Sequence, residues 1–378
     1  MRCPPVLLRC PPVLLPVLLL GLLAALPCCT PLLLSPQPFL ASLSAPPRLP
    51  VWPVFPGVVL SALDLLGQGP LARRLEDEGV GGRVAPMQLP PEASPFVLLV
   101  HHRHRFNSRQ PVRPLSRLLL PEGFPAHPHR GFETVTMCLR GGMVHRDSLG
   151  LKQSYGEGRG GDTQWLTAGG GLLHEEMWNG DEEQELYQLW VDLPAKSKLD
   201  PPSLSVLSPR PAGQPGVEEV PRPPGQPGAS VSIRHVSTDP KPTTLPLDPS
   251  HETVLVYVRR GSAAGVSVSS PAPGASAFVP VHSCAQLNPR AAASLTFSSD
   301  KPCDLLLLTG RPLNQPVVAS GSFVMDSQQG IDDAVRDYQA GRMGPAFDHK
   351  LSDEEWREAV ERHWRAVGDT REEGWAKQ

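Results

Sequence analysis

The sequence FPAHPHRGFETVTMCLRGGMVHRDSL, residues 124 to 149, combines metal-ligand residue types, a strand pattern and a tight glycine turn. His127 and His129 are two residues apart, so in an extended strand both imidazoles leave the same face and can share one ion. Glu133 keeps that parity. The following ETVTMCL alternates and is rich in β-branched residues, and with the Gly141–Gly142 pair it predicts a strand that ends in a hairpin.

A second stretch with ligand residues, GDTQWLTAGGGLLHEEM, occupies residues 161 to 177. A Gly-Asp turn leads into an apolar run that ends at His174 and Glu176, again two residues apart. Together the two stretches offer three imidazoles and one carboxylate, a set that suits a mid-row divalent ion and can leave coordination positions open. From residue chemistry alone, an exposed His-Pro-His turn without metal is the alternative.

Several of these motifs have a distinctive amino-acid sequence. HPHRGFETVT, HRDSLG and GDTQWLTAGGGLLHEEM closely resemble the pirin family of the cupin superfamily. GRPLNQPVVASGSFVMDS, followed by IDDAVRDYQAGRMG, resembles the end of the pirin C-terminal domain. The resemblance extends from about Gly79 to Gly344 and is weak in the middle.

The resemblance implies an all-β bicupin: two tandem cupin (jelly-roll) β-barrels, here with C-terminal helices, and one Fe(II) in the N-terminal barrel. The family's ligand positions fall on His127, His129, His174 and Glu176. Glu133 has the place of the glutamate of the general cupin motif, which makes it a candidate for orienting a metal ligand or for acting as a base near the metal. Another divalent metal would also suit this ligand set.

Length and composition agree with many short strands. The 378 residues allow two or three domains, and 34 Gly with 46 Pro favour strands joined by turns. A net charge of −3 gives no overall nucleic-acid or membrane-surface signature, so we expect no direct nucleic-acid binding.

Residues 1–62 are predicted to be a targeting leader or a disordered segment. They contain no acidic residue, and Val13–Leu26 has the length of a signal-peptide apolar region. Pro16 and Pro27 bracket too few residues for a membrane span, which needs about 20, so no stable span is expected. Such a leader indicates secretory or plastid targeting, whereas a mis-assigned start codon would leave the protein in the cytoplasm or nucleus.

The three cysteines beyond the leader do not suggest a disulfide framework. Cys138, Cys284 and Cys303 are sparse and odd in number. Cys138 has the opposite strand parity to the histidine pair, so we expect it to be a core or outward-facing residue and not a ligand.

The first barrel is predicted over residues 79–194, with strands at 95–100 and 186–194. The run His101–Arg105 departs from the family and is interpreted as a solvated basic loop, with anion or nucleic-acid contact as the alternative. Residues 195–229 are rich in Pro and Gly and are predicted to be a linker.

The second barrel is predicted over residues 230–344 from four β-rich runs, VSIRHVS, HETVLVYVRRGS, AFVPVHS and CDLLLLTGRP. His251 and His282 have no ligand residue two positions away, so both are expected to have a structural or surface role. The chain should therefore bind one ion.

Two helices are predicted after Met325. Ile331, Ala334, Val335 and Tyr338 form one apolar stripe, and the capping-box spacing from Ser352 to Glu355 begins a second helix in a helical extension, residues 345–378. The Trp-containing stripe of this second helix is expected to pack on the chain's own surface, with a partner site as the alternative.

Two functional classes follow from the resemblance. The first is an Fe(II)-dependent oxidoreductase of the quercetin 2,3-dioxygenase type that takes a flavonol-like small molecule, for which the predicted ligands leave two octahedral positions open. The second is a redox-sensing regulator that binds partner proteins such as transcription factors. A monomer is expected in either case.

Overall fold

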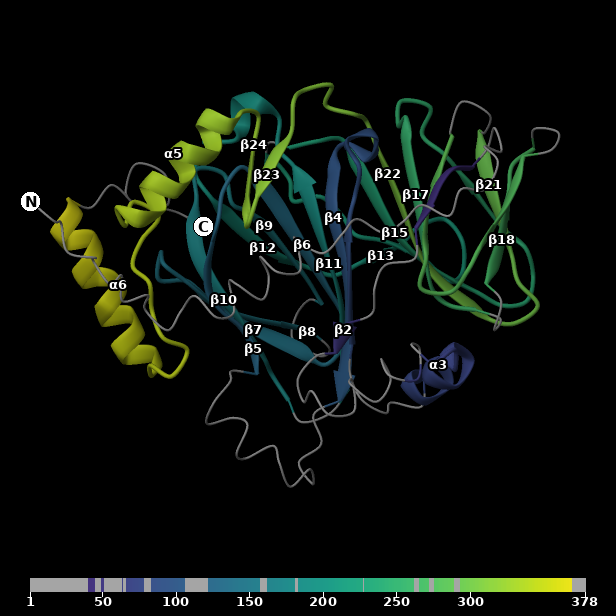
Figure 1. The fold of residues 1–378 in the computed structure, drawn as a ribbon, viewed down its shortest axis with the longest axis horizontal. Coiled ribbons are helices and arrows are strands. Elements are labelled where there is room, and N and C mark those ends of the chain that lie inside the picture. Colours follow the sequence, from purple (N-terminus) through teal and green to yellow (C-terminus); the bar gives the residue numbers. More distant parts are fainter. Residues whose placement is uncertain are drawn as a thin grey trace, which may run out of the picture.

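The computed structural model describes residues 40–44, 49–50, 63, 66–77, 83–105, 122–156, 162–180, 183–226, 228–261, 265–271, 275–288 and 293–368. These residues form two antiparallel β-barrels side by side, with two helices at the outer end of the first barrel (Figure 1). Each barrel consists of one seven-stranded and one four-stranded sheet.

The first barrel contains both stretches with ligand residues. Its seven-stranded sheet has the order β12 (Ser203–Leu207), β9 (Thr163–Thr167), β6 (Phe132–Arg140), β11 (Glu183–Asp192), β4 (Phe96–Arg105), β3 (Arg83–Gln88) and β2 (Leu49–Pro50). Its four-stranded sheet has the order β5 (Gly123–His129), β10 (Leu172–Trp178), β7 (Gly142–Asp147) and β8 (Lys152–Gly156).

The second barrel repeats this plan. Its seven-stranded sheet has the order β1 (Leu40–Ser44), β20 (Cys284–Leu287), β17 (Thr253–Arg260), β22 (Cys303–Gly310), β15 (Val231–Thr238), β14 (Val217–Glu219) and β13 (Arg210–Pro211). Its four-stranded sheet has the order β16 (Thr243–Pro246), β21 (Ser294–Ser298), β18 (Val266–Ser269) and β19 (Ser276–Val279). The four predicted β-rich runs all form strands.

The two seven-stranded sheets pack against each other. Their shared apolar core takes Val135 and Leu189 from the first barrel, and Leu255 and Leu306 from the second. The central strands are therefore buried on both faces, one toward this core and one toward a barrel interior. This explains why β22, CDLLLLTG, is nearly continuous in apolar residues and does not alternate.

The C-terminal helices cover the four-stranded sheet of the first barrel. After the short hairpin of β23 (Val318–Ser320) and β24 (Phe323–Met325) come α5 (Gln328–Gln339) and α6 (Asp353–Val367). The predicted capping box of Ser352 and Glu355 begins α6. Trp356 and Trp364 pack in one core with Leu173 of β10, so the helix lies on the chain's own surface as expected (Figure 1).

Three short helices complete the described structure. They are α3 (Gly69–Asp77) and the 3-10 turns η1 (Pro91–Ala93) and η2 (Ala195–Ser197). No helix among the described residues is both long and apolar enough to cross a membrane. The apolar run Val13–Leu26 lies outside the described residues.

The predicted hairpin at Gly141–Gly142 is wrong. β6 pairs with β9 and β11, whereas β7 pairs with β10 and β8 in the other sheet of the barrel. Gly141 has a positive φ of 70°, so the chain turns sharply there and passes from one sheet to the other. A glycine turn after a strand does not itself specify which strand becomes the partner.

The interpretation of the His101–Arg105 run as a solvated loop is also wrong. The run belongs to β4, between β3 and β11, and His101, His102 and Arg103 are buried. Acidic residues of β11 stand opposite: Arg103 pairs with Glu183, and the His101 ring lies 2.9 Å from a Glu185 oxygen. These cross-strand partners are about 80 residues away in sequence, so the basic run looked solvated when considered alone.

Two segments expected to lie outside the barrels contribute strands to them. Within the predicted leader, Leu40–Ser44 pairs with β20 of the second barrel and Leu49–Pro50 pairs with β3 of the first. The predicted linker contributes β12 to the first barrel, and β13 and β14 to the second. Of these strands, β2 and β13 contain a proline, and both lie at the edge of a sheet, where a missing N–H donor is tolerated.

Candidate metal centre

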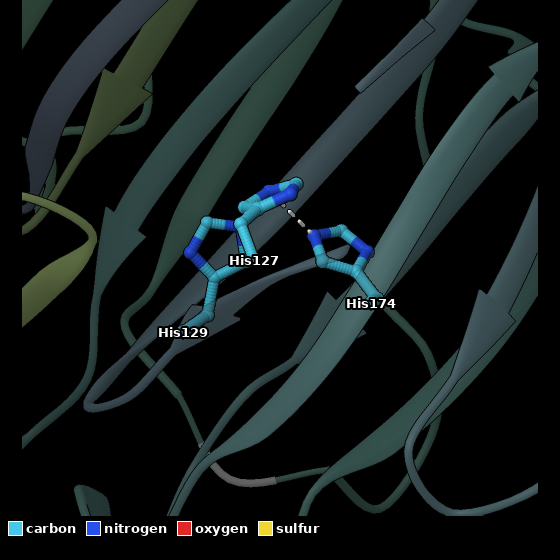
Figure 2. Close-up of side chains that lie close together, drawn as sticks. All are labelled: His127, His129 and His174. Atoms are coloured by element: carbon cyan, nitrogen blue, oxygen red, sulfur yellow. Dashed lines mark hydrogen bonds between the residues drawn. The ribbon is translucent and has the colours of Figure 1, made fainter. Parts of the chain in front are cut away.

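Three histidines converge inside the first barrel (Figure 2). The antiparallel register of β5 and β10 places His127 directly opposite His174, and His129 is two residues along on the same face of β5. The Nε2 atom of His127 lies 3.1 Å from Nε2 of His129 and 3.1 Å from Nε2 of His174. All three ligand atoms lie within 4.8 Å of one another.

This arrangement fits a divalent ion. Nitrogens bound at about 2.1 Å in adjacent octahedral positions lie about 3.0 Å apart, close to the two Nε2 separations. Burial lowers the pKa of all three imidazoles, so they are neutral near pH 7. Neutral imidazoles are the form that binds metal, because each offers a lone pair.

Backbone carbonyls orient two of the three rings. His127 Nδ1 donates to the carbonyl of Pro125 at 2.8 Å, and His129 Nδ1 to that of Ser322 at 3.4 Å. A proton on Nδ1 leaves the lone pair on Nε2, the atom that faces the other rings. The β23–β24 turn therefore helps to orient a ring of the first barrel.

Glu176, the predicted fourth ligand, is buried on the same side of β10 as His174, but the converging group among the described residues contains the three histidines without it. One carboxylate oxygen accepts a hydrogen bond from Tyr155 at 2.8 Å, and the other accepts from Gln188 at 2.8 Å. Burial raises the pKa of Tyr155 well above its usual value, so this phenol stays protonated and donates. The carboxylate thus points into the barrel with a fixed orientation.

Glu133 does not share this interior. Thr136, an odd number of residues away on β6, donates to Glu176 inside the barrel, so Glu133 faces the core between the barrels. There it accepts hydrogen bonds from Trp165 and from Arg222, which also forms an ion pair with it at 2.7 Å. Glu133 therefore does not orient a metal ligand or face the site as a base; this carboxylate joins the first barrel to the 195–229 segment.

Sequence reasoning missed Thr136, Tyr155 and Gln188, which surround the Glu176 carboxylate. They lie on three different strands, and no motif links them in sequence. Two further polar atoms on this inner face, Thr134 Oγ1 and Trp190 Nε1, are buried without a hydrogen-bond partner in the described part of the chain. Such atoms are available to a molecule bound in the barrel.

The other candidate residues named from the sequence are buried or hydrogen-bonded within the fold. Cys138 is buried beside Met143 and Tyr155, and Cys284 and Cys303 are free and buried, so the described cysteines form no disulfide. His251 lies within hydrogen-bond distance of Thr309 and Ser230. Among the described residues, the three histidines of the first barrel form the one cluster suited to a metal.

Comparison with known proteins connects this geometry to a family. Residues 81–191 match the Pirin family, and residues 235–344 match the Pirin C-terminal cupin domain. The chain belongs to the pirin family. It is therefore a bicupin of the cupin superfamily, and the expected all-β class with C-terminal helices is confirmed.

Curated relatives match this chain over most of their own length. A pirin-like protein of Solanum lycopersicum is 36% identical over 235 residues, which are 59% of this chain and 78% of that protein. Pirin of Rattus norvegicus is 32% identical over 288 residues, which are 72% of this chain and 91% of that protein. A crystal structure of quercetin 2,3-dioxygenase from Acinetobacter baumannii matches with a TM-score of 0.57 and 26% identity, covering 70% of this chain and 93% of that one.

Proposed function

We propose that this pirin-family protein binds one Fe(II) in its first barrel through His127, His129, His174 and Glu176, and that it oxidises a flavonol-like substrate. The convergence of three neutral Nε2 atoms carries the proposal. The similarity to the quercetin 2,3-dioxygenase of Acinetobacter baumannii supports the substrate class. A bound iron with open positions would supply a place for substrate oxygen and dioxygen together.

The chain's own residues prepare the site in two ways. Tyr155 and Gln188 hold the Glu176 carboxylate by hydrogen bonds, and because its oxygens lie outside the converging group of three histidines, the carboxylate would shift toward them to bind an ion. Phe132 and Trp190 pack beside His129, with ring centroids 5.0 and 5.6 Å away. These rings give an aromatic substrate an apolar surface next to the ligands and exclude water from it.

A regulator is the second candidate, and one feature favours it. Glu175 lies between the two predicted ligands of β10 but on the opposite face of the strand, where it is buried and pairs with Arg146 at 2.5 Å. Arg146 in turn donates to the carbonyls of Leu351 and His349 in the segment before α6. Under this candidate, a change at the metal would be passed through these contacts to the C-terminal surface, where a partner protein would bind.

Aerobic turnover separates the two candidates. The iron-loaded protein is given a panel of flavonols while oxygen uptake and metal content are measured in the same sample. We expect uptake with at least one flavonol, about one iron per chain, and loss of both when His127→Ala and His174→Ala are combined. Iron retained without oxygen uptake rejects the enzyme, and a redox-dependent change in partner affinity would then support the regulator. Metal content unaffected by the double substitution would reject the site itself.

A further inference from the structure

A second buried group of polar residues lies directly behind His174. His174 Nδ1 is 3.3 Å from Nδ1 of His145, and His145 Nε2 is 3.1 Å from a carboxylate oxygen of Asp147. All three side chains are fully buried. His145 and Asp147 lie on the same face of β7, whose register places Asp147 opposite His174.

We propose that Asp147 and His145 are positioning residues that hold His174 in the tautomer able to bind the metal. The inference rests on the proposed metal site. It gives a role to the HRDSLG motif, which contributes none of the predicted ligands. It concerns where one proton lies, and neither residue touches the ion.

The position of that proton follows from which group donates and which accepts in each hydrogen bond between Asp147, His145 and His174. The other Asp147 oxygen accepts from the backbone N–H groups of Leu149 and Leu151, at 2.9 and 3.0 Å. A carboxylate is an acceptor only, so His145 must donate to it from Nε2. In a neutral ring Nδ1 of His145 is then an acceptor, and His174 donates to it from Nδ1. The lone pair of His174 is left on Nε2, which faces the other two ligands.

The three ligand rings thus share one tautomer, with the proton on Nδ1, but different groups impose it. Backbone carbonyls orient His127 and His129, as described above, and those carbonyls can only accept. His174 instead faces another imidazole, which can accept or donate. Asp147 removes that ambiguity.

Substituting Asp147→Asn tests the relay because the size is kept and only the hydrogen-bond roles change. The two backbone N–H groups hold the amide oxygen, so the amide NH₂ faces His145 Nε2 and donates to it. His145 must then carry its proton on Nδ1, and His174 is pushed to the tautomer with a proton on Nε2. That proton would point at the metal position.

The first measurement is the ¹⁵N chemical shift of the ring nitrogens in metal-free protein. We expect a protonated Nδ1 on His174 in the natural protein and a protonated Nε2 in Asp147→Asn. A protonated Nε2 on His174 in the natural protein overturns the proposal. This measurement needs no bound ion, so it decides the relay even if the proposed iron site fails.

The second measurement is cobalt(II) affinity by competition with a chelator, in a double-substitution cycle. Asp147→Asn should weaken binding about 10- to 100-fold, the usual effect of losing a partner of a metal-bound imidazole. His145→Asn provides an amide oxygen that can accept from His174 directly, so Asp147→Asn added to it should cost less than about twofold. If Asp147→Asn lowered cobalt affinity equally in the natural protein and in the His145→Asn variant, the loss would reflect general damage to the fold and would overturn the relay.

Asp162→Asn serves as the matched control. Asp162 is a partly exposed carboxylate of the same barrel, and its partner is Thr163. Its substitution should leave cobalt affinity and the His174 tautomer unchanged. A loss as large as that of Asp147→Asn would show that any removed carboxylate weakens binding and would overturn the relay.

Discussion

At the scale of single residues, parity along a strand decides which side chains meet. His174 and Glu176 face the barrel interior, whereas Glu175 between them faces the C-terminal segment. On β6, Glu133 faces the core shared by the barrels, whereas Thr136 faces the interior of the first barrel. Neighbouring carboxylates can therefore be substituted to test opposite faces of one strand.

Glu176→Gln should weaken iron binding and raise the Fe(III)/Fe(II) potential, because a carboxylate favours the more highly charged ion. The barrel should stay folded, since the size is kept and the amide can still accept from Tyr155. Chelator competition and protein-film voltammetry measure the two effects. Asp162→Asn, which removes a partly exposed carboxylate of the same barrel, is the control. An unchanged potential in Glu176→Gln would remove this carboxylate from the ligand set.

His102 should make the fold sensitive to acid. Burial, aided by the neighbouring His101, lowers the pKa of His102 from 6.5 to about 3. Between these values the unfolded chain binds a proton that the folded chain excludes, so stability is full above pH 6.5 and falls as the pH drops toward 3. The slope for one proton is about 1.4 kcal/mol per pH unit.

His102→Phe should flatten this slope, because phenylalanine binds no proton yet can pack against Phe124 and Trp178, which touch the imidazole ring. Urea unfolding of metal-free protein between pH 4 and pH 7.5 measures it. The difference at pH 7.5 isolates the change in packing. Parallel stability curves for the two proteins would show that His102 does not carry the effect.

At the scale of elements, α6 braces the outer side of the strand that holds two predicted ligands. Trp356 is fully buried against this sheet, and the Arg146 guanidinium lies 5.5 Å from its ring centroid. The helix begins at Asp353, beyond residue 344 where the family match ends. The extension is therefore part of the packed structure of this chain.

Trp356→Ala should lower the free energy of unfolding by about 3 kcal/mol or more, because it removes a large side chain from a closed core. Urea denaturation measures the loss. Val367→Ala is the matched control at the end of the same helix, where the side chain is 52% exposed, and should change stability by less than about 0.5 kcal/mol. Equal effects would mean that α6 does not brace the sheet.

At the scale of the whole molecule, the barrels are joined by more than the chain between them. His101 of the first barrel lies 2.8 Å from the hydroxyl of Tyr257 in the second, and Arg259 of the second pairs with Glu185 of the first at 2.5 Å. Paired charges hold the pKa of Glu185 well below its usual value although its burial acts in the opposite direction. We propose that the two domains are residues 79–194 and residues 230–344. Each barrel also includes strands from outside its range.

A chain that begins at Leu63 should keep the metal site but lose stability in the second barrel. It lacks β1, which covers the edge of β20, and it loses Leu43, whose burial contributes about 2 kcal/mol. Hydrogen exchange of the β20 amides and urea unfolding measure the loss. A chain beginning at Phe39 is the control, since both lack the apolar run. Equal stability of the two chains would show that β1 is dispensable, as the prediction of a separate leader implied.

Local patterns in the sequence were sufficient for much of the fold. Alternation and turn residues predicted the strands at 95–100 and 186–194, and an apolar stripe with a capping box predicted α5 and α6. The family's motifs indicated two cupin barrels. These features succeed because the period of a strand or helix and the chemistry of a cap depend on residues close together in the chain.

Tertiary structure alone decided which strands pair and what each polar residue meets. His-x-His and His-x-Glu predicted two half-sites, but only the β5–β10 register places His127 opposite His174. The partners of Glu176, the relay behind His174 and the acidic residues opposite His101–Arg105 come from strands tens of residues away. Burial and hydrogen-bond roles depend on such contacts, because a side chain's surroundings are built by segments that no local pattern brings together.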